Sequence, residues 1–293
     1  MNRKINIKKN IVIGETDKEF LTADFYYPEE AEDLPIVILI HGGGFESGSK
    51  EKYKEWGPFL AKSGYATLAI NYRLATPSYS TWPAIINDIW AAVNWSVNNS
   101  HKFGIEPLKM AMIGDSAGAQ LASYFTLAYP VNASFKIRAT IAVYGVYNLE
   151  QNWLENDDNE LNKKLIGQTY IDSPEIYKLA SPVNFINEAV KNPAFDTSFF
   201  IIWGEKDEHV YPSQSKEFIK KLENAGIDTE YLSIPDKGHL WFNIMPGLDE
   251  GSLDSYPNSL VVPRIMNFLN ENLSINEVGN FSEKLLHQLK DKT

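Results

Sequence analysis

Short apolar runs alternate with longer amphipathic stretches along most of the chain. Two strand-like segments at residues 5–13 and 19–27 come first, and a regular alternation of strand-length and helix-length segments follows them. We expect strands over 36–40, 66–72, 109–113 and 137–144, and helices over 54–63, 83–98 and 117–128. Such alternation predicts an α/β protein with a mostly parallel central sheet, helices on both faces, and sites at the carboxyl ends of the strands.

Between residues 147 and 192 this alternation gives way to short, polar helices that contain aromatic residues. An insertion at this point can fold over the active edge of the sheet, so we expect a small helical lid. Its larger apolar side chains wall a substrate pocket or form the core of the insertion: Trp153, Leu154, Leu165, Ile166, Tyr170 and Tyr177. No repeat or flexible linker divides the chain, which predicts a single domain over 1–293 with the lid inside it.

A tight turn after the strand at 109–113 carries the candidate nucleophile. The sequence Gly114-Asp115-Ser116-Ala117-Gly118 leads directly into the helix over 117–128. Its small residues allow a sharp turn, which presents the Ser116 hydroxyl at the N-terminus of the helix. A turn with a capping serine has similar residues, but the strand-to-helix setting favours a nucleophile.

A glycine-rich loop, His41-Gly42-Gly43-Gly44-Phe45, follows the strand at 36–40. Glycines at the end of a strand let backbone N–H groups approach a ligand closely. Acyl transfer requires such donors, because they stabilise the negative charge on the carbonyl oxygen. We assign the N–H groups of Gly43, Gly44 and Ala117 to this oxyanion hole, with Gly42 as a substitute for either glycine.

A nucleophilic serine also requires a base in hydrogen-bond contact. His239 is the preferred base, because it lies on the loop after the strand-like segment 229–234. The rival is His209, which follows another apolar strand. The remaining histidines have other expected roles: His41 anchors the glycine loop, and two lie in polar helical stretches, His101 and His287.

Asp207 is the preferred acid that orients the base, because it ends a strand beside the predicted site and precedes His239 in the chain. The order of the triad is then Ser116, Asp207, His239. Asp207 lies only two residues from His209, and side chains so spaced in an extended loop diverge, which disfavours His209 as the base. Two other acids have simpler explanations: Asp236 caps a turn, and Asp196 precedes its strand.

Several motifs taken together resemble the bacterial carboxylesterases of the α/β-hydrolase superfamily, including hormone-sensitive-lipase-like and feruloyl-esterase-like members. Besides the glycine loop, the elbow at Ser116 and the Asp207 and His239 loops, they are Asn71-Tyr72-Arg73-Leu74, Trp82-Pro83-Ala84 with Asp88, and Ala180-Ser181-Pro182. The resemblance implies an α/β-hydrolase fold and a cofactor-free serine carboxylesterase that forms an acyl-enzyme. It also implies a structural ion pair between Arg73 and Asp88.

The resemblance implies small to medium acyl esters, aromatic ones included, as substrates, with water as the second reactant. The formal net charge of −11 disfavours anionic substrates, so we expect the esters to be neutral. We expect Phe45, Trp153, Trp241 and Phe242 to line the substrate pocket. The chain departs from the hormone-sensitive-lipase pattern in its short N-terminal segment and in extra loop residues at 249–257. An arylformamidase-type amidase with the same triad stays open, and a non-catalytic ligand-binding protein is disfavoured because both nucleophile and base are present.

Composition and charge limit the kinds of partner that we expect for this protein. The formal net charge of −11 disfavours nucleic acid, and the sequence has no cysteine, which excludes disulfides and suits a cytoplasmic protein. No metal is expected, because the histidines show no HExxH or similar spacing. No apolar run approaches the roughly 18 residues of a membrane helix. Apolar residues recur at helical spacing near the C-terminus and predict a helix that docks on the body or on another subunit, which leaves a homo-oligomer open: Phe281, Leu285, Leu286 and Leu289.

Overall fold

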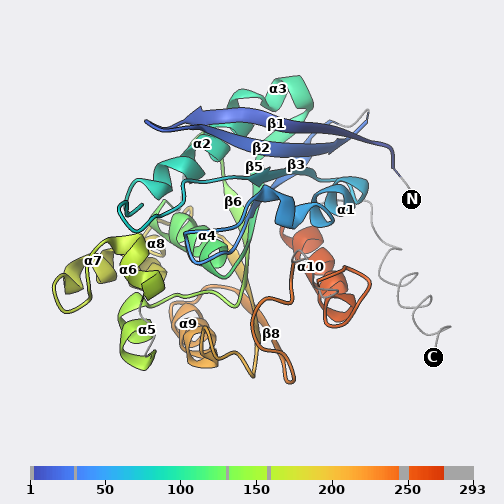
Figure 1. The fold of residues 1–293 in the computed structure, drawn as a ribbon. Helices are drawn as coiled ribbons and strands as arrows, with labels where there is room; N and C mark the ends of the chain where they lie inside the picture. The colour runs from blue at the N-terminus through green and yellow to red at the C-terminus, as the bar shows by residue number, and fades with distance from the viewer. Residues whose placement is uncertain (1–2, 30–31, 130–131, 157–159, 244–250, 274–293) are drawn as a thin grey trace.

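The computed structural model describes residues 3–29, 32–129, 132–156, 160–243 and 251–273, and within them eight strands form one sheet in the order β1-β2-β4-β3-β5-β6-β7-β8 (Figure 1). The first two strands pair antiparallel, β2 pairs antiparallel with β4, and the other pairs are parallel. The strands are β1 (Ile5–Glu15), β2 (Phe20–Pro28), β3 (Leu34–Ile40), β4 (Ala66–Ile70), β5 (Ile105–Asp115), β6 (Ile137–Val143), β7 (Ser198–Gly204) and β8 (Thr229–Ile234). The predicted α/β architecture is confirmed.

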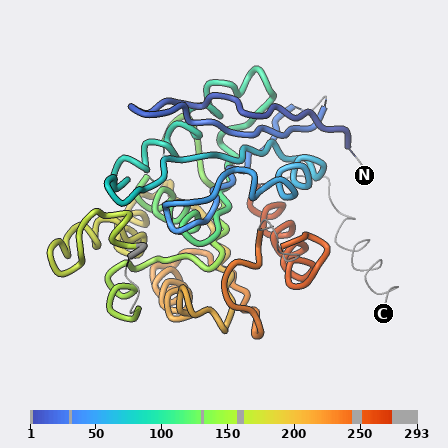
Figure 2. Tube along the Cα trace, viewed as in Figure 1, coloured from blue at the N-terminus to red at the C-terminus, as the bar shows by residue number. Residues whose placement is uncertain are grey.

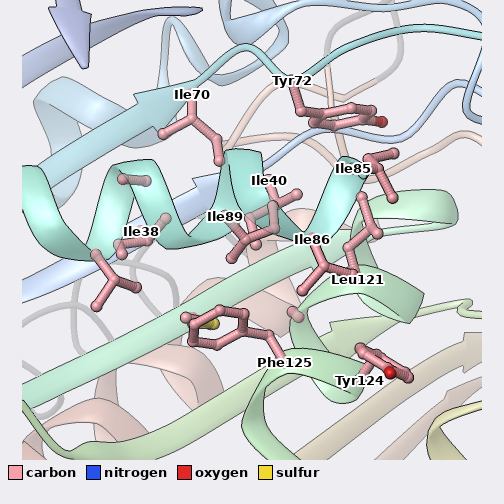
Figure 3. Packing of buried hydrophobic residues seen from close by; sticks show 14 of the residues in the cluster. Ile38, Ile40, Ile70, Tyr72, Ile85, Ile86, Ile89, Leu121, Tyr124 and Phe125 are labelled. Carbon is pink, nitrogen blue, oxygen red and sulfur yellow. The ribbon is translucent and has the colours of Figure 1, made fainter. Parts of the chain in front are cut away.

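Helices cover both faces of the sheet. Along the buried strand β3, Ile38 and Ile40 pack on one face in a cluster with α2 (Ile85–Asn98) and α4 (Ala117–Ala128), which Figure 3 shows. Val37 and Leu39 pack on the opposite face with α1 (Trp56–Lys62) and α10 (Asn258–Leu273). Successive side chains of a strand point to opposite faces of the sheet. A fully apolar strand such as β3 therefore requires helices on both faces.

The remaining helices are short or peripheral. A 3₁₀ helix, η1 (Lys50–Tyr53), follows the glycine loop, α3 (Ser100–Phe103) precedes β5, and α9 (Pro212–Asn224) joins β7 to β8. Phe218 and Leu222 of α9 pack on the sheet in a cluster with residues of α4 and β7. No helix in the described ranges is both long and apolar enough to cross a membrane. The predicted helix containing Phe281 and its neighbours lies outside the described residues.

The expected helical insertion lies between β6 and β7. It consists of α5 (Leu149–Glu155), α6 (Glu160–Ile166), α7 (Pro174–Ala180), η2 (Pro182–Phe185) and α8 (Ile186–Ala189). Figure 2 follows this segment as the chain leaves the sheet at one side of the molecule and returns to it. Leu165, Ile166 and Tyr177 are buried in the cluster with α2 and α4, whereas Leu154 is exposed. Most of these apolar side chains therefore hold the insertion onto the body of the protein.

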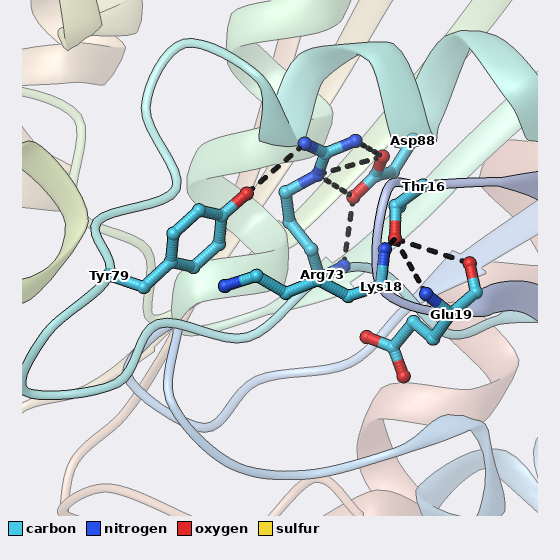
Figure 4. Close-up of polar contacts among 6 residues, drawn as sticks. All are labelled: Thr16, Lys18, Glu19, Arg73, Tyr79 and Asp88. Carbon is cyan, nitrogen blue, oxygen red and sulfur yellow. Dashed lines mark hydrogen bonds and ion pairs between the residues drawn. The ribbon is translucent and has the colours of Figure 1, made fainter.

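An ion pair fixes the loop that follows β4. The Arg73 guanidinium contacts the Asp88 carboxylate, with Nη2 2.6 Å from Oδ1, and the Arg73 backbone N–H donates to Oδ2 at 2.8 Å (Figure 4). Farther along the loop, Tyr79 packs against Lys18, whose Nζ lies 3.5 Å from the ring centroid. The predicted pair is present, and it ties this loop to the first turn of α2.

Candidate active site

The elbow at Ser116 joins β5 to α4. Ser116 is the N-cap residue of α4 and has φ 52° and ψ −118°, a conformation that is costly for a residue with a side chain. Gly118 packs so closely on the end of β3 that a Cβ atom there would lie 1.9 Å from the Ile40 carbonyl oxygen. A glycine is therefore required two residues after the serine, and the strained turn leaves Ser116 partly exposed.

Ser116, His239 and Asp207 lie in one chain of hydrogen bonds. The His239 Nε2 atom is 2.9 Å from Ser116 Oγ, and its Nδ1 atom is 2.6 Å from Asp207 Oδ2. The three residues come from the start of α4, the loop after β7 and the loop after β8. Because these strands are parallel, their carboxyl ends meet at one edge of the sheet, which brings together residues 123 and 32 positions apart.

The acid is fixed independently of the base. The second carboxylate oxygen of Asp207, Oδ1, accepts the backbone N–H groups of His209 at 3.0 Å and Val210 at 2.9 Å. With both oxygens bonded and the side chain buried, Oδ2 is directed at the imidazole of His239. The carboxylate therefore accepts the Nδ1 proton, which leaves Nε2 to accept the serine proton.

The rival residues lie elsewhere or make other contacts. His209 is exposed and bonds Asp207 through its backbone N–H, and its ring centroid lies 5.6 Å from that of His239. Asp236 accepts the Tyr256 hydroxyl, and Asp196 forms an ion pair with Arg138 before β7 begins. Two other histidines were predicted to lie in polar helical stretches away from the site. His101 is exposed on α3, and His287 lies outside the described residues.

The glycine loop lies against the elbow. Gly43 has φ 139°, and a Cβ atom on it would lie 2.1 Å from the Ser47 carbonyl oxygen, so the loop requires glycine there. A Cβ atom on Gly42 would lie 3.0 Å from that of Ser116, which shows how near the two segments are. Across the described ranges, the N–H groups of Gly43, Gly44 and Ala117 donate to no protein acceptor. The backbone N–H groups predicted for the oxyanion hole are therefore free of competing protein acceptors in the described part of the chain.

A buried carboxylate joins three segments of the site. Asp115 Oδ1 accepts the Gly42 N–H at 2.9 Å, the Tyr53 hydroxyl at 3.0 Å and the Asn243 amide at 2.8 Å. Burial raises the pKa of Asp115, and the charge of Lys52 and the hydrogen bonds from the Gly42 N–H and the Tyr53 hydroxyl act in the opposite direction. Sequence reasoning assigned Asp115 no role, because nothing in the motif shows which distant groups it accepts.

His41 anchors the glycine loop, as predicted. It is buried, its Nδ1–H donates to the Gly42 carbonyl at 3.0 Å, and its ring stacks on Tyr72 with centroids 4.2 Å apart. The Tyr72 hydroxyl donates to the His41 carbonyl at 2.7 Å. Burial lowers the pKa of His41 to about 4, so the ring is neutral at pH 7.

The aromatic residues predicted for the pocket are mostly buried. Phe45, Trp241 and Phe242 are 3%, 1% and 0% exposed, so they present almost no surface to a ligand. Phe242 stacks on Trp56, with ring centroids 4.7 Å apart, in the cluster with α1 and α10. Trp153 is half-buried in the insertion and contacts Tyr177, with centroids 5.6 Å apart.

This strand order, with a serine at the elbow after β5 and an acid and a histidine after β7 and β8, defines the protein as an α/β-hydrolase. The model of the BD-FAE family matches residues 23–222, and the chain belongs to that family.

Comparison with known proteins agrees with this class. The chain is 29% identical over 217 residues to the esterase LipQ of Mycobacterium tuberculosis, which covers 70% of this chain and 50% of LipQ. It is 24% identical over 269 residues to the esterase LipC of the same organism, covering 85% of this chain and 63% of LipC. The chain thus spans about half to two thirds of the length of these relatives.

Two solved structures share the fold. A truncated carbohydrate esterase from gut microbiota superposes with a TM-score of 0.73 at 21% identity and covers 93% of this chain and 98% of its own. A bacterial heroin esterase also has a TM-score of 0.73 at 21% identity, with 92% of this chain and 84% of its own covered. At this level of identity the likeness establishes the fold alone.

Proposed function

We propose that the protein is a serine carboxylesterase that hydrolyses esters through an acyl-enzyme on Ser116. The observation that carries this proposal is the chain of two hydrogen bonds from Ser116 Oγ through His239 to Asp207, at 2.9 and 2.6 Å. A serine hydroxyl is protonated at neutral pH, and this arrangement supplies the acceptor that it needs at the moment of attack.

In the first step, Ser116 Oγ attacks the ester carbonyl carbon while its proton moves to Nε2 of His239. A new C–O bond forms, and the carbonyl π pair moves onto the oxygen, whose charge the N–H groups of Gly43, Gly44 and Ala117 stabilise. The carboxylate of Asp207 stabilises the imidazolium. The tetrahedral intermediate then collapses, the bond to the alcohol oxygen breaks, and the alcohol leaves with the proton from His239.

In the second step, water replaces the alcohol. His239 accepts a proton from the water molecule, and the hydroxide attacks the acyl carbon in the same oxyanion site. Collapse breaks the bond to Ser116 Oγ, which recovers its proton from His239. The sum is ester plus water giving carboxylic acid plus alcohol, with the enzyme unchanged and no cofactor needed.

The net charge and the named relatives indicate the substrate class. The protein carries a net charge of −11, which disfavours anionic substrates, and the relatives LipQ and LipC are named esterases. We infer that its substrates are neutral esters of small to medium acyl groups, aromatic ones included.

The helices between β6 and β7 act as the lid beside the site. The lack of cysteine is compatible with a location in the cytoplasm.

The proposal is tested with Ser116→Ala and a panel of p-nitrophenyl esters of increasing acyl length. Turnover should fall about 10⁴-fold or more, because only the oxyanion donors remain. Ser123→Ala is the matched control, since Ser123 is a buried serine of α4, the helix that Ser116 caps, and its hydroxyl has no hydrogen-bond partner among the described residues. Its turnover should match that of the wild type.

Turnover by Ser116→Ala comparable to the control would contradict the nucleophile. A matched p-nitroanilide in the same assay decides the alternative of an amidase, which would turn over the anilide as well as the ester, whereas an esterase would leave the anilide essentially uncleaved. Mass spectrometry after treatment with a fluorophosphonate should place a single adduct on Ser116, and an adduct on another residue would reject the assignment independently of rate.

A further inference from the structure

A lysine outside the proposed triad contacts the glycine loop. The Lys52 Nζ atom, from η1, donates to the Gly42 carbonyl oxygen at 3.0 Å, and the side chain is partly buried. Its neighbours of the same charge have other environments. Lys50 is buried and pairs with Asp24 at 3.1 Å, whereas Lys54 is exposed at the end of η1.

The carbonyl that Lys52 contacts belongs to the same peptide unit as the N–H group of Gly43. A trans peptide directs its C=O and its N–H to opposite sides, so whatever fixes the carbonyl also fixes the direction of the Gly43 N–H. Two donors hold this carbonyl, Lys52 Nζ and His41 Nδ1, each at 3.0 Å. The Gly43 N–H donates to no acceptor in the described part of the chain.

The charge on Lys52 also bears on the strength of that donor. A cation that bonds a carbonyl withdraws electron density from the peptide and makes its N–H a stronger donor, because successive hydrogen bonds polarise one another. The adjoining peptide behaves differently, since the Gly42 N–H donates to the buried carboxylate of Asp115 at 2.9 Å. A negative charge so near the loop opposes an oxyanion, and the ammonium group of Lys52 offsets it.

We propose that Lys52 is a positioning residue for the oxyanion, acting through the peptide between Gly42 and Gly43. It holds the Gly43 N–H toward the reacting carbonyl oxygen and strengthens it as a donor, without touching the substrate. This inference rests on the proposed esterase function, because it assigns a residue to the same reaction.

The test compares three variants of the full chain. Lys52→Met removes both the charge and the donor, and Lys52→Gln removes the charge but retains a donor. Lys54→Met removes a charge from the same segment without a contact to the loop. For each we measure kcat and KM for a p-nitrophenyl ester, the unfolding midpoint in urea, and inhibition by a trifluoromethyl ketone, whose adduct with serine carries an oxyanion.

We expect kcat of Lys52→Met to fall about tenfold with KM changed less than twofold, because the donor matters chiefly in the transition state. The inhibition constant of the trifluoromethyl ketone should rise by a similar factor, while that of the matched methyl ketone stays within twofold. Lys52→Gln should lose about threefold in kcat, and Lys54→Met should match the wild type.

Equal kcat for the Lys52 and Lys54 variants would overturn the inference, as would a rise in KM with kcat unchanged. A purely structural role would lower the unfolding midpoint and affect both ketones equally. If Lys52→Met does not fold, Lys52→Gln carries the test with the same criteria. Failure of the proposed function is recognised separately, because wild-type turnover would then survive Ser116→Ala.

Discussion

Asp207 offers a test that separates its catalytic role from its structural role. Its carboxylate divides its contacts, with Oδ2 on His239 Nδ1 and Oδ1 on two backbone N–H groups. Asp207→Asn keeps an oxygen for the backbone donors and places an NH₂ group against the imidazole. His239 must then present an unprotonated Nδ1, so its proton moves to Nε2, which can no longer accept the proton of Ser116.

The magnitudes follow from these contacts. The wrong tautomer lowers kcat by about 10⁴-fold, as the same exchange does in other serine hydrolases, which corresponds to about 5.5 kcal/mol of activation free energy. Asp207→Ala should lose at least as much activity. It also leaves the N–H groups of His209 and Val210 without their acceptor, which costs about 1–3 kcal/mol for a buried donor. Its free energy of unfolding should fall by about 2–4 kcal/mol, well below that of Asp207→Asn.

The assay combines kcat for a p-nitrophenyl ester from pH 6 to 9 with equilibrium unfolding in urea. Asp228→Asn is the matched control, because Asp228 accepts the Ser198 hydroxyl at 3.0 Å beside the amino ends of β7 and β8. It should leave kcat unchanged. The reasoning is refuted if Asp207→Asn retains more than a tenth of wild-type kcat, or if Asp207→Ala is as stable as Asp207→Asn.

Two further predictions concern stability. Asp88→Asn should lower the free energy of unfolding by about 3 kcal/mol in urea with kcat nearly unchanged, because it leaves the Arg73 guanidinium, 13% exposed, without its partner charge. The double replacement of Arg73 by Met and Asp88 by Leu should regain most of this loss, and a double variant no more stable than the single one would argue against the ion-pair explanation. Because burial lowers the pKa of His41 to about 4, below its ordinary 6.5, the unfolded chain binds the proton first. The free energy of unfolding of the wild type should therefore fall by about 2 kcal/mol between pH 7 and pH 5, and His41→Gln should lose less over this range. An equal fall in both proteins would contradict this role of His41.

The alternation of strands and helices could be predicted from the sequence, because each element has its own local pattern of apolar residues. Short, continuous apolar runs predicted the parallel strands, and the carboxyl ends of these strands predicted where functional side chains gather. Element boundaries moved by a few residues. For example, β5 begins at Ile105 rather than near 109, because Leu34 and Pro35 of β3 offer it partners that only the folded sheet places there.

The predicted pocket shows where local reasoning ends. Trp241 and Phe242 lie two and three residues after His239, yet both rings lie in the core. A large apolar residue next to a functional one is compatible with either position, and the direction of each side chain depends on the path of the loop. The contacts of Asp115 and Lys52 could not be predicted from the sequence either, because their partners come from other segments of the chain.

What the sequence determined by itself is the set of elements and the kinds of chemical group at their ends, since both depend on local periodicity and on residue type. What only the tertiary structure decided is which groups meet. The sequence already favoured His239 over His209 as the base, but the folded chain alone shows its contact with Ser116 and the single oxygen of Asp115 that joins the glycine loop to Tyr53 and Asn243. Hydrogen bonds require contact within about 3 Å, and that precision comes from the packing of the whole sheet and its helices.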